Sequence, residues 1–253
     1  MSFKSLHHQP QPLLLVNVWD VMSARVAEQQ NASAIGTSSA AIAAMLGYRD
    51  GEQMRFSELK YVVERIRANT PLPLTVDLEA GYSRQPTEIA DHVRQLVDLG
   101  VVGINMEDST VDPQIKRTLV PARSFAQRLA SVKDHLGTMG EPLFWNVRTD
   151  AFLMGHPTAL AETQERIRHY ERSGADGIFV PGLVKEEDIA AVVAATPLPI
   201  NVMALPELLT FARLQALGVK RISMGNFLFS KMYNDLEQRL HQVLHEPSLA
   251  AIF

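Results

Sequence analysis

The stretch TEIADHVRQLVDLGVVGINM, residues 87–106, contains one full step of the repeat that decides the fold. Apolar residues recur at helical spacing from Thr87 to Leu99, and Gly100 follows, where a glycine commonly ends a helix in the left-handed conformation. The apolar segment Gly103–Met106 comes next and has the length of a buried strand. The stretch therefore predicts a helix that leads directly into a strand of a helix-covered sheet.

The same transition from helix to strand recurs elsewhere in the chain. Ser173-Gly174-Ala175 and Leu217-Gly218-Val219 each place a glycine between a helical segment and an apolar one. Pro71-Leu72-Pro73 and Pro197-Leu198-Pro199 lie at two further transitions, because proline stops a helix and is tolerated at the start of a strand. Strand and helix signals alternate in this way along the whole chain, which is typical of repeated βα units.

The expected elements amount to eight βα units. We expect strands at Leu13–Val18, Ala34–Thr37, Leu74–Asp77, Gly103–Met106, Phe144–Arg148, Gly177–Val180, Ile200–Met203 and Arg221–Ser223. We expect helices around Ser23–Gln30, Ser57–Ala68, Thr87–Leu99, Ala122–Leu136, Thr158–Ser173, Lys185–Ala195, Pro206–Ala216 and Phe227–His245. The sequence therefore predicts an α/β fold, a single (β/α)8 TIM-type barrel over residues 1–253. An open doubly wound sheet is the competing fold, but no G-x-G-x-x-G follows the first strand to support its dinucleotide-binding form.

The composition limits the classes of partner. The chain has 24 Lys and Arg against 28 Asp and Glu, a net charge of −4, and no run of basic residues. We therefore expect no nucleic acid and no membrane as partners, and a small molecule as the ligand. The absence of cysteine excludes disulfides, zinc–thiolate sites and thiol catalysis. The apolar run Leu13–Val16 is too short for a signal peptide or a membrane span, and we expect a cytoplasmic protein.

Acidic residues follow two neighbouring strands at the end where such a barrel builds its active site. Asp77 and Glu79 are two positions apart in an extended segment and point the same way, while Glu107 follows the next strand. Three oxygen donors with no lysine nearby in sequence indicate a divalent cation, Mg²⁺ or Mn²⁺, held partly through water. Asp50 is a possible fourth member, although Asp50-Gly51 is also an ordinary turn signal.

Other strand ends carry candidate substrate-binding residues. The turn at Ser38 and Ser39 could hold a carboxylate with its backbone N–H groups, or it could be an ordinary capped turn. Trp19 and Asn201 complete this set, and we interpret Asp20 as the cap of the helix that follows it.

Candidate catalytic residues are harder to assign. Arg148 is suited to grip a carboxylate or phosphate in a bidentate way, and the alternative is an ion pair with Asp150 or Glu107. Glu107 and Tyr48 are the other candidate catalytic residues, and Tyr82 also belongs to the possible set of general acids and bases. The sequence alone does not select among them.

Five segments of the chain form a recognisable set. They are Asn17-Val18-Trp19-Asp20 with Ser23-Ala24-Arg25, Gly47-Tyr48-Arg49-Asp50, Val76-Asp77-Leu78-Glu79-Ala80-Gly81-Tyr82, Gly103-Ile104-Asn105-Met106-Glu107-Asp108 and Asn146-Val147-Arg148-Thr149-Asp150-Ala151-Phe152. Together they resemble the isocitrate lyase/phosphoenolpyruvate mutase superfamily, from Val16 to about Phe229. The D-x-[DE]-x-G-Y segment followed by E-D after the next strand is the most specific part.

The resemblance implies a barrel that binds Mg²⁺ and a 2-oxo acid, and that makes or breaks a C–C or P–C bond through an enolate. It implies Asp77 nearest the metal, with Glu79, Glu107 and Asp50 holding its waters. It also implies that Ser38 and Ser39 receive the substrate carboxylate and that Arg148 contacts the distal anionic group. By analogy, the last helix is exchanged between subunits, and the protein is a homodimer or homotetramer.

The chain departs from the family pattern in the loop after E-D. Lyases for isocitrate and methylisocitrate use a cysteine there, so these activities are not expected. Mutases and phosphonopyruvate hydrolases carry a longer loop, whereas this chain has Ser109–Arg117, in which Lys116 or Arg117 could substitute. Pro181 stands where mutase-type enzymes have a histidine, which weakens the case for phosphorus chemistry.

We therefore expect a Mg²⁺-dependent lyase, decarboxylase or hydrolase acting on a small 2-oxo or 2-hydroxy di-acid, with Ser109–Thr118 as a lid. A phosphoenolpyruvate/phosphonopyruvate mutase or hydrolase is the alternative. A Schiff-base aldolase would need a lysine at a strand end, and Lys185 more plainly begins a helix. Outside the enzymes, a barrel that binds a 2-oxo acid with reduced catalysis stays open.

Overall fold

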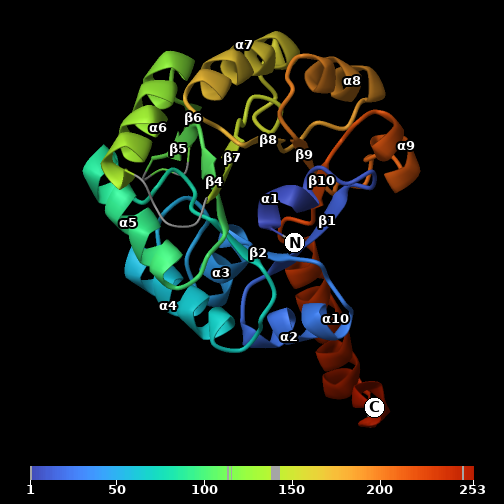
Figure 1. Ribbon diagram of the computed structural model, residues 1–253. Coiled ribbons are helices and arrows are strands. Elements are labelled where there is room, and N and C mark those ends of the chain that lie inside the picture. The colour runs from blue at the N-terminus through green and yellow to red at the C-terminus, as the bar shows by residue number, and fades with distance from the viewer. Residues whose placement is uncertain (1, 113, 115, 138–142, 247) are drawn as a thin grey trace.

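Eight parallel strands close into a barrel in the order β1-β10-β9-β8-β7-β4-β3-β2 (Figure 1), which confirms the predicted (β/α)8 architecture. The computed structural model describes residues 2–112, 114, 116–137, 143–246 and 248–253. The barrel strands are β1 (Leu13–Val18), β2 (Ile35–Thr37), β3 (Leu74–Asp77), β4 (Gly103–Glu107), β7 (Phe144–Arg148), β8 (Gly177–Val180), β9 (Ile200–Met203) and β10 (Arg221–Ser223).

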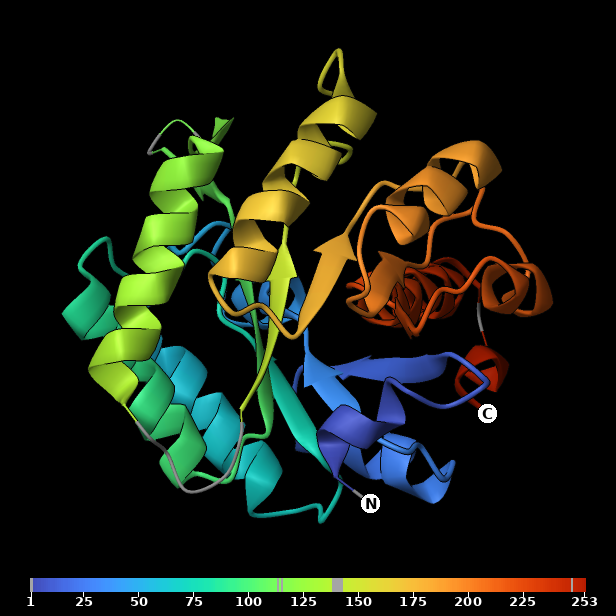
Figure 2. The ribbon, with the colours of Figure 1, turned by 45° about the horizontal axis from the view of Figure 1, so that its top comes forward.

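Helices cover the outside of the barrel (Figures 1 and 2). They are α2 (Val21–Gln29), α3 (Ser39–Met45), α4 (Phe56–Arg67), α5 (Pro86–Asp98), α6 (Ala122–Leu136), α7 (Ala159–Arg172), α8 (Glu186–Ala194) and α9 (Phe211–Ala216), and they are followed by a last helix, α10 (Phe227–His245). Their apolar stripes pack on the strands, as in α5, where Ile89, Val93 and Leu96 are fully buried. The expected helix at Pro206–Ala216 begins only at Phe211, because the Thr210 side chain accepts a hydrogen bond from the Arg213 N–H and caps it.

A short helix, α1 (Phe3–Leu6), closes the amino-terminal end of the barrel and was not predicted. The Phe3 ring packs edge-on against Phe144, with centroids 5.7 Å apart, and the His7 ring stacks on Phe144 at 4.0 Å. Phe144 is the first residue of β7, so these contacts lie at the end of the barrel where the strands begin. The helix does not cover the opposite end of the barrel, where the strands finish and where the active sites of such barrels lie.

The segment after β4 folds into a second, two-stranded antiparallel sheet of β5 (Ser109–Val111) and β6 (Arg117–Leu119). This hairpin occupies the place of the expected lid, of which Pro113 and Ile115 lie outside the described residues. Its first strand is anchored to the barrel, because the N–H of Asp108, directly before β5, donates to the carbonyl of Arg148 on β7 at 3.1 Å. The side chains of β5 and β6 are therefore held at the carboxyl ends of the barrel strands.

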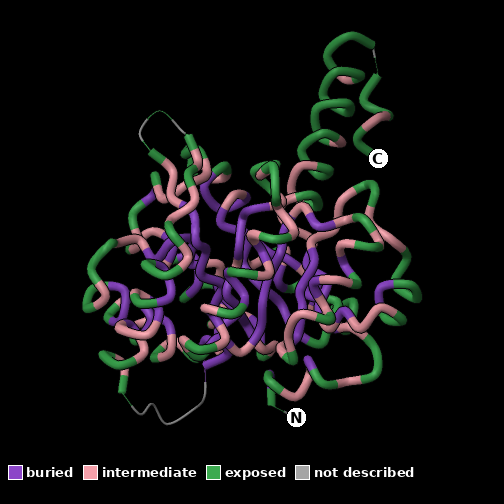
Figure 3. Tube along the Cα trace, turned by 90° about the horizontal axis from the view of Figure 1, so that it is seen from above, coloured by how far each residue is buried: buried purple, intermediate pink, exposed green. Residues whose placement is uncertain are grey.

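The last helix, α10, projects away from the barrel, and its surface is mostly exposed (Figure 3). None of its residues is buried, although Leu228, Leu236, Leu240 and Leu244 lie along it. In the described part of the chain, no helix is long and apolar enough to cross a membrane.

Candidate active site

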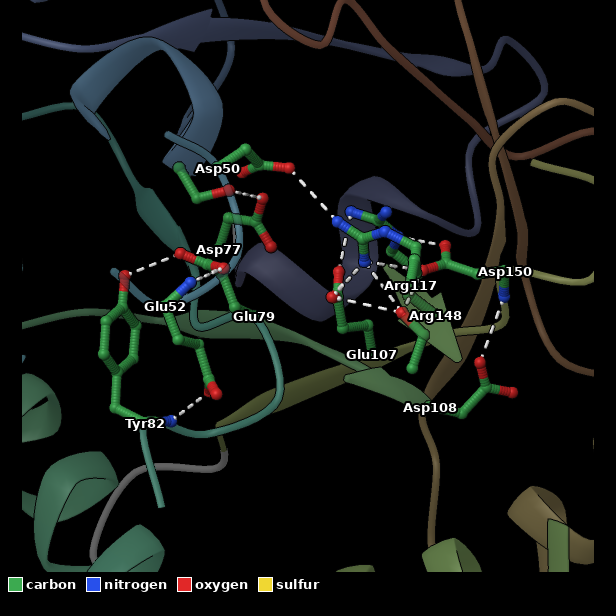
Figure 4. A network of polar contacts seen from close by, with 12 residues as sticks. Asp50, Glu52, Asp77, Glu79, Tyr82, Glu107, Asp108, Arg117, Arg148 and Asp150 are labelled. Atoms are coloured by element: carbon green, nitrogen blue, oxygen red, sulfur yellow. Dashed lines mark hydrogen bonds and ion pairs between the residues drawn. The ribbon is translucent and has the colours of Figure 1, made fainter. Parts of the chain in front are cut away.

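Three polar residues end three neighbouring strands. Asp77 is the last residue of β3, Glu107 of β4 and Arg148 of β7. These strands are adjacent in the barrel, and the register pairs Glu107 with Arg148. Their side chains therefore meet at the carboxyl end of the barrel (Figure 4), as the sequence predicts.

Two arginines and two carboxylates form a closed ring of ion pairs, which we call the arginine–carboxylate ring. Arg148 contacts Glu107 Oε2 through Nη1 at 3.0 Å and donates from Nε to Asp150 Oδ1 at 2.6 Å. Arg117, from β6, contacts Glu107 Oε1 and donates to Asp150 Oδ2 at 2.9 Å, both through Nη1. Each carboxylate thus gives one oxygen to each arginine, and the formal charges of the ring cancel. The ion-pair alternative for Arg148 is confirmed.

The two carboxylates of the ring differ in acidity. Burial raises the pKa of Glu107 to about 8, although Arg148 acts in the opposite direction. Burial also acts to raise the pKa of Asp150, but Arg148, Arg117 and the hydrogen bond from Ser109 together outweigh it, and the pKa of Asp150 is lowered. Burial would lower the pKa of Arg148, yet Asp150 and Glu107 raise it well above its usual value. Ionisation of Glu107 therefore depends on the guanidinium groups around it.

Beside the ring lies a group of acids that we call the acidic cluster: Asp50, Asp77 and Glu79 (Figure 4). Burial raises the pKa of Asp77, and Asp50 raises it further. Burial raises the pKa of Glu79 to about 8, and both Asp50 and Asp77 contribute to the shift. Among the described residues, the only cation paired with this cluster is Arg117, whose Nη2 lies 3.1 Å from Asp50 Oδ2. Asp77 and Glu79 therefore have no ion-pair partner among the described residues, and their raised pKa values show that their ionised forms are disfavoured without a further cation.

Two loops interlock to hold the acidic cluster. The Glu52 N–H donates to Glu79 Oε2 at 2.6 Å, and in return the Tyr82 N–H donates to Glu52 Oε1 at 2.6 Å. The Tyr82 hydroxyl donates to Glu79 Oε1 at 2.8 Å. Glu52, Glu79 and Tyr82 all have positive φ, between 49° and 60°, which costs backbone energy and tends to occur at functional sites.

One atom of the cluster tests whether a cation fits. Asp77 Oδ2 accepts a hydrogen bond of 2.8 Å from Ser39 Oγ, but Asp77 Oδ1 is buried without any hydrogen-bond partner. A buried carboxylate oxygen without a donor is costly unless a cation faces it. No three His, Asp or Glu side chains of the described residues form a ready cage for an ion. The residues fit a cation such as Mg²⁺, which keeps several water ligands and needs few carboxylates.

A buried network supports the ring from behind. Asp108 Oδ2 accepts hydrogen bonds from Arg166 Nη1 at 2.9 Å and from the Tyr170 hydroxyl at 2.6 Å, both from α7. Asp108 Oδ1 accepts from the backbone N–H of Asp150 at 3.1 Å. The network therefore fixes the backbone of Asp150, whose carboxylate contacts both arginines of the ring.

Several candidates from the sequence lie outside this arrangement. Tyr48 is 37% exposed, and its hydroxyl donates to Glu58 at 3.0 Å. Trp19 packs edge-on against Phe229, with centroids 5.3 Å apart, and the side chain of Asn201 is buried inside the barrel beside Ser223.

The structure confirms the predicted helix caps. Asp20 caps α2 by accepting from the Ser23 N–H at 2.7 Å. Ser38 caps α3 by accepting from the Ala41 N–H at 3.4 Å, which confirms the interpretation as a capped turn, while Ser39 orients Asp77. Lys185 is exposed and precedes α8, as expected.

The role of Arg117 could not be assigned from the sequence, and those of Ser109 and Arg166 were not predicted. Lys116 is exposed, whereas Arg117 reaches the ring. The Ser109 hydroxyl donates to Asp150, and no motif marks it. In the sequence, Arg166 resembles any charged residue on the solvent-exposed face of an amphipathic helix. Its role as the partner of Asp108 is visible only in the structure, where it is buried.

Comparisons with known proteins agree with this fold. The sequence profile described as phosphoenolpyruvate phosphomutase matches residues 3–244. The chain belongs to this family of enzymes, and the five segments singled out in the sequence lie within the matched range.

Individual relatives cover most of the chain. An uncharacterized protein of Mycobacterium tuberculosis (strain ATCC 25618 / H37Rv) is 34% identical over 91% of this chain and 84% of its own length. An oxaloacetate decarboxylase of Bradyrhizobium sp. (strain BTAi1 / ATCC BAA-1182) is 30% identical over 76% of this chain and 66% of its own.

Solved structures give the same result. A Burkholderia cenocepacia J2315 protein, provisionally described as a phosphonomutase, is 40% identical with a TM-score of 0.88, covering 95% of this chain and 98% of that one. A phosphonopyruvate hydrolase in complex with oxalate and Mg²⁺ shares the fold at 21% identity, with a TM-score of 0.85, covering 99% of this chain and 89% of that one.

Proposed function

We propose that the protein is a Mg²⁺-dependent lyase, decarboxylase or hydrolase that breaks a C–C bond of a small 2-oxo or 2-hydroxy di-acid. One observation carries the proposal: an acidic cluster in which Asp77 and Glu79 have no ion-pair partner lies directly beside a charge-balanced ring whose Arg148 keeps one nitrogen, Nη2, without an acceptor among the described residues. The cluster suits a cation, and the arginine suits an anion. A di-acid bound to a metal ion at one end would bring the cation to the acidic cluster and its other carboxylate to the arginine.

In the acidic cluster, Asp77 would hold the cation directly, since its Oδ1 has no other partner. Glu79 and Asp50 would act through water, whereas both oxygens of Glu107, which was also expected at the metal, face Arg117 and Arg148 instead. When bound, Mg²⁺ would supply Lewis-acid stabilisation of the negative charge that develops as the bond breaks. The Mg²⁺ and oxalate bound to the phosphonopyruvate hydrolase support this choice, and Mn²⁺ is the alternative ion.

Arg148 would bind the anionic group at the other end of the substrate. Asp150 and Glu107 engage its Nε and Nη1, while Nη2 has no acceptor among the described residues. A guanidinium held from behind in this way presents its remaining N–H groups in a fixed direction, which suits a carboxylate. The backbone N–H of Ser38 donates to the Val18 carbonyl at 3.0 Å, so the turn at Ser38 and Ser39 is not assigned to the metal-proximal carboxylate.

The test is a substrate panel with Mg²⁺: oxaloacetate, other 2-oxo and 2-hydroxy di-acids, and phosphonopyruvate. We expect turnover of a di-acid, and a loss of at least about 100-fold in kcat/KM in Asp77→Asn and in Arg148→Met, equivalent to roughly 2.7 kcal/mol. Arg123→Met, at an exposed arginine, is the matched control. Turnover that survives in both site variants would contradict the proposal.

The same panel decides between two other functions. The similarity to a provisionally described phosphonomutase favours phosphonopyruvate as the second candidate substrate, and turnover of that compound alone would select it. Metal-dependent binding of 2-oxo acids without turnover of any would instead select a binding protein.

We also propose that the protein is a homodimer or a larger homo-oligomer joined through α10. Leucines of this helix, among them Leu236 at 47% exposure, line its surface, and a groove of about 440 Å³ between α2 and α10 is lined by Met22, Val26 and Met232. Exposed apolar surface of this kind is costly in water. Light scattering should give at least twice the monomer mass, and Leu236→Glu should lower it.

A further inference from the structure

We propose that Arg117 is a positioning residue for Arg148 and so determines the affinity for the distal anionic group of the substrate. The inference rests on the proposed function and deepens it. Its basis is that both arginines share the same two carboxylates, Glu107 and Asp150 (Figure 4).

The sharing is complementary rather than competitive. Arg117 takes Glu107 Oε1 and Asp150 Oδ2, and Arg148 takes the other oxygen of each. The carboxylates are 3% and 0% exposed, so water cannot replace a missing donor. With both sides of each carboxylate occupied, neither can rotate, and the guanidinium of Arg148 keeps one orientation.

Charge gives Arg117 a second effect. Without it, Arg148 would face two buried carboxylates alone, and the former ring would carry a net charge of −1. An incoming anion would then meet negative charge at the place where the intact ring is neutral. The acidic cluster would be less affected, because only its member Asp50 contacts Arg117, at 3.1 Å. Loss of Arg117 should therefore weaken binding of the distal anion and leave the metal end nearly intact.

Arg117 is committed to protein acceptors, which separates its role from that of a substrate contact. Its Nη1 contacts Glu107, Asp150 and Ser109 Oγ, the last at 2.7 Å. Its Nη2 contacts Asp50. Lys116, next to it on the same hairpin, is exposed and provides a matched control.

The experiment compares two ligands in the presence of Mg²⁺ by calorimetry. Oxalate offers only the metal-proximal end, whereas 3,3-difluorooxaloacetate also carries a distal carboxylate. For Arg117→Met, we expect at least 10-fold weaker binding of difluorooxaloacetate and less than 3-fold change for oxalate. Arg117→Lys should show the same selective loss to a smaller extent, because one ammonium cannot serve both carboxylates and Asp50. Lys116→Met should match the wild type for both ligands.

The outcomes are distinguishable. Equal weakening of both ligands in the arginine variants, or no weakening of either, overturns the positioning role while the proposed function stands. A wild-type protein that binds neither ligand with Mg²⁺ overturns the proposed function and this inference together. If Arg117→Met does not fold, the ratio of the two affinities in Arg117→Lys decides.

Discussion

Ser39 Oγ donates a hydrogen bond of 2.8 Å to Asp77 Oδ2, and this contact turns the other oxygen, Oδ1, into a buried position where it has no partner. The arrangement links α3 to the end of β3 and leaves Asp77 oriented but incompletely satisfied. A metal ligand needs this combination of fixed geometry and an available lone pair.

Asp77→Ala should abolish Mg²⁺ binding and leave the fold intact. The variant removes the ligand with the unpartnered oxygen, and it also removes a buried charge whose pKa burial raises. The metal-free variant should therefore melt no lower than the wild type. Calorimetric titration with Mg²⁺ and a thermal melt measure the two effects, with the exposed Asp91→Ala as control. Retained Mg²⁺ affinity would count against the site.

The stability of the metal-free protein should fall as pH rises from about 4.5 to about 8. Burial raises the pKa of Glu79 from 4.5 to about 8, so in this window the folded state binds more protons than the unfolded state. The free energy of unfolding then decreases as the pH rises. Glu79 alone contributes at most about 1.4 kcal/mol per pH unit to this decrease.

Mg²⁺ should remove most of that slope, because a bound cation favours the ionised carboxylate. Urea unfolding between pH 5 and pH 8, with chelator or with Mg²⁺, measures it. Glu79→Gln is the matched variant and should flatten the metal-free curve. A stability that rises with pH in chelator would contradict the assignment of Glu79.

Arg166→Met should destabilise the protein by roughly 3–5 kcal/mol, since it leaves the buried Asp108 carboxylate without its cation. Arg168→Met, on the exposed face of the same helix, should change the free energy of unfolding by less than about 0.5 kcal/mol. Urea denaturation compares the two. Equal stabilities would mean that the Asp108 network does not contribute the stability that its burial implies.

The parts of the fold that could be predicted from sequence are those with a repeating local signal. Glycines such as Gly100 and Gly174 have positive φ, 83° and 85°, at the ends of helices where the pattern places them. The helix α1 carries no such signal, because its position depends on contacts with Phe144, far away in sequence.

Among the site residues, too, some could be predicted from the sequence and others could not. Asp77, Glu107 and Arg148 could be found because strand ends in a barrel converge regardless of detail. Arg117 could not be assigned, since its role depends on a hairpin whose pairing of Val111 with Arg117 has no marker in the loop sequence. Tyr48 fits a motif, yet a neighbouring carboxylate, Glu58, takes its hydroxyl away from the site.

Gly51→Ala should lower both stability and Mg²⁺ affinity, because this glycine supports the loop that carries Asp50. Its φ is 107°, and an added Cβ would lie 2.7 Å from the side chain of Val111 on β5. Backbone strain and overpacking should together cost about 2–4 kcal/mol.

Gly47→Ala is the matched control for the strain alone. Gly47 has a φ of 83°, but nothing lies within 4 Å of the added Cβ, so we expect a cost of only about 1–2 kcal/mol and unchanged Mg²⁺ affinity. Urea unfolding and Mg²⁺ titration of both variants separate strain from displacement of the hairpin. If both variants lose the same stability and keep the same Mg²⁺ affinity, the contact between the Asp50 loop and β5 does not support the metal site.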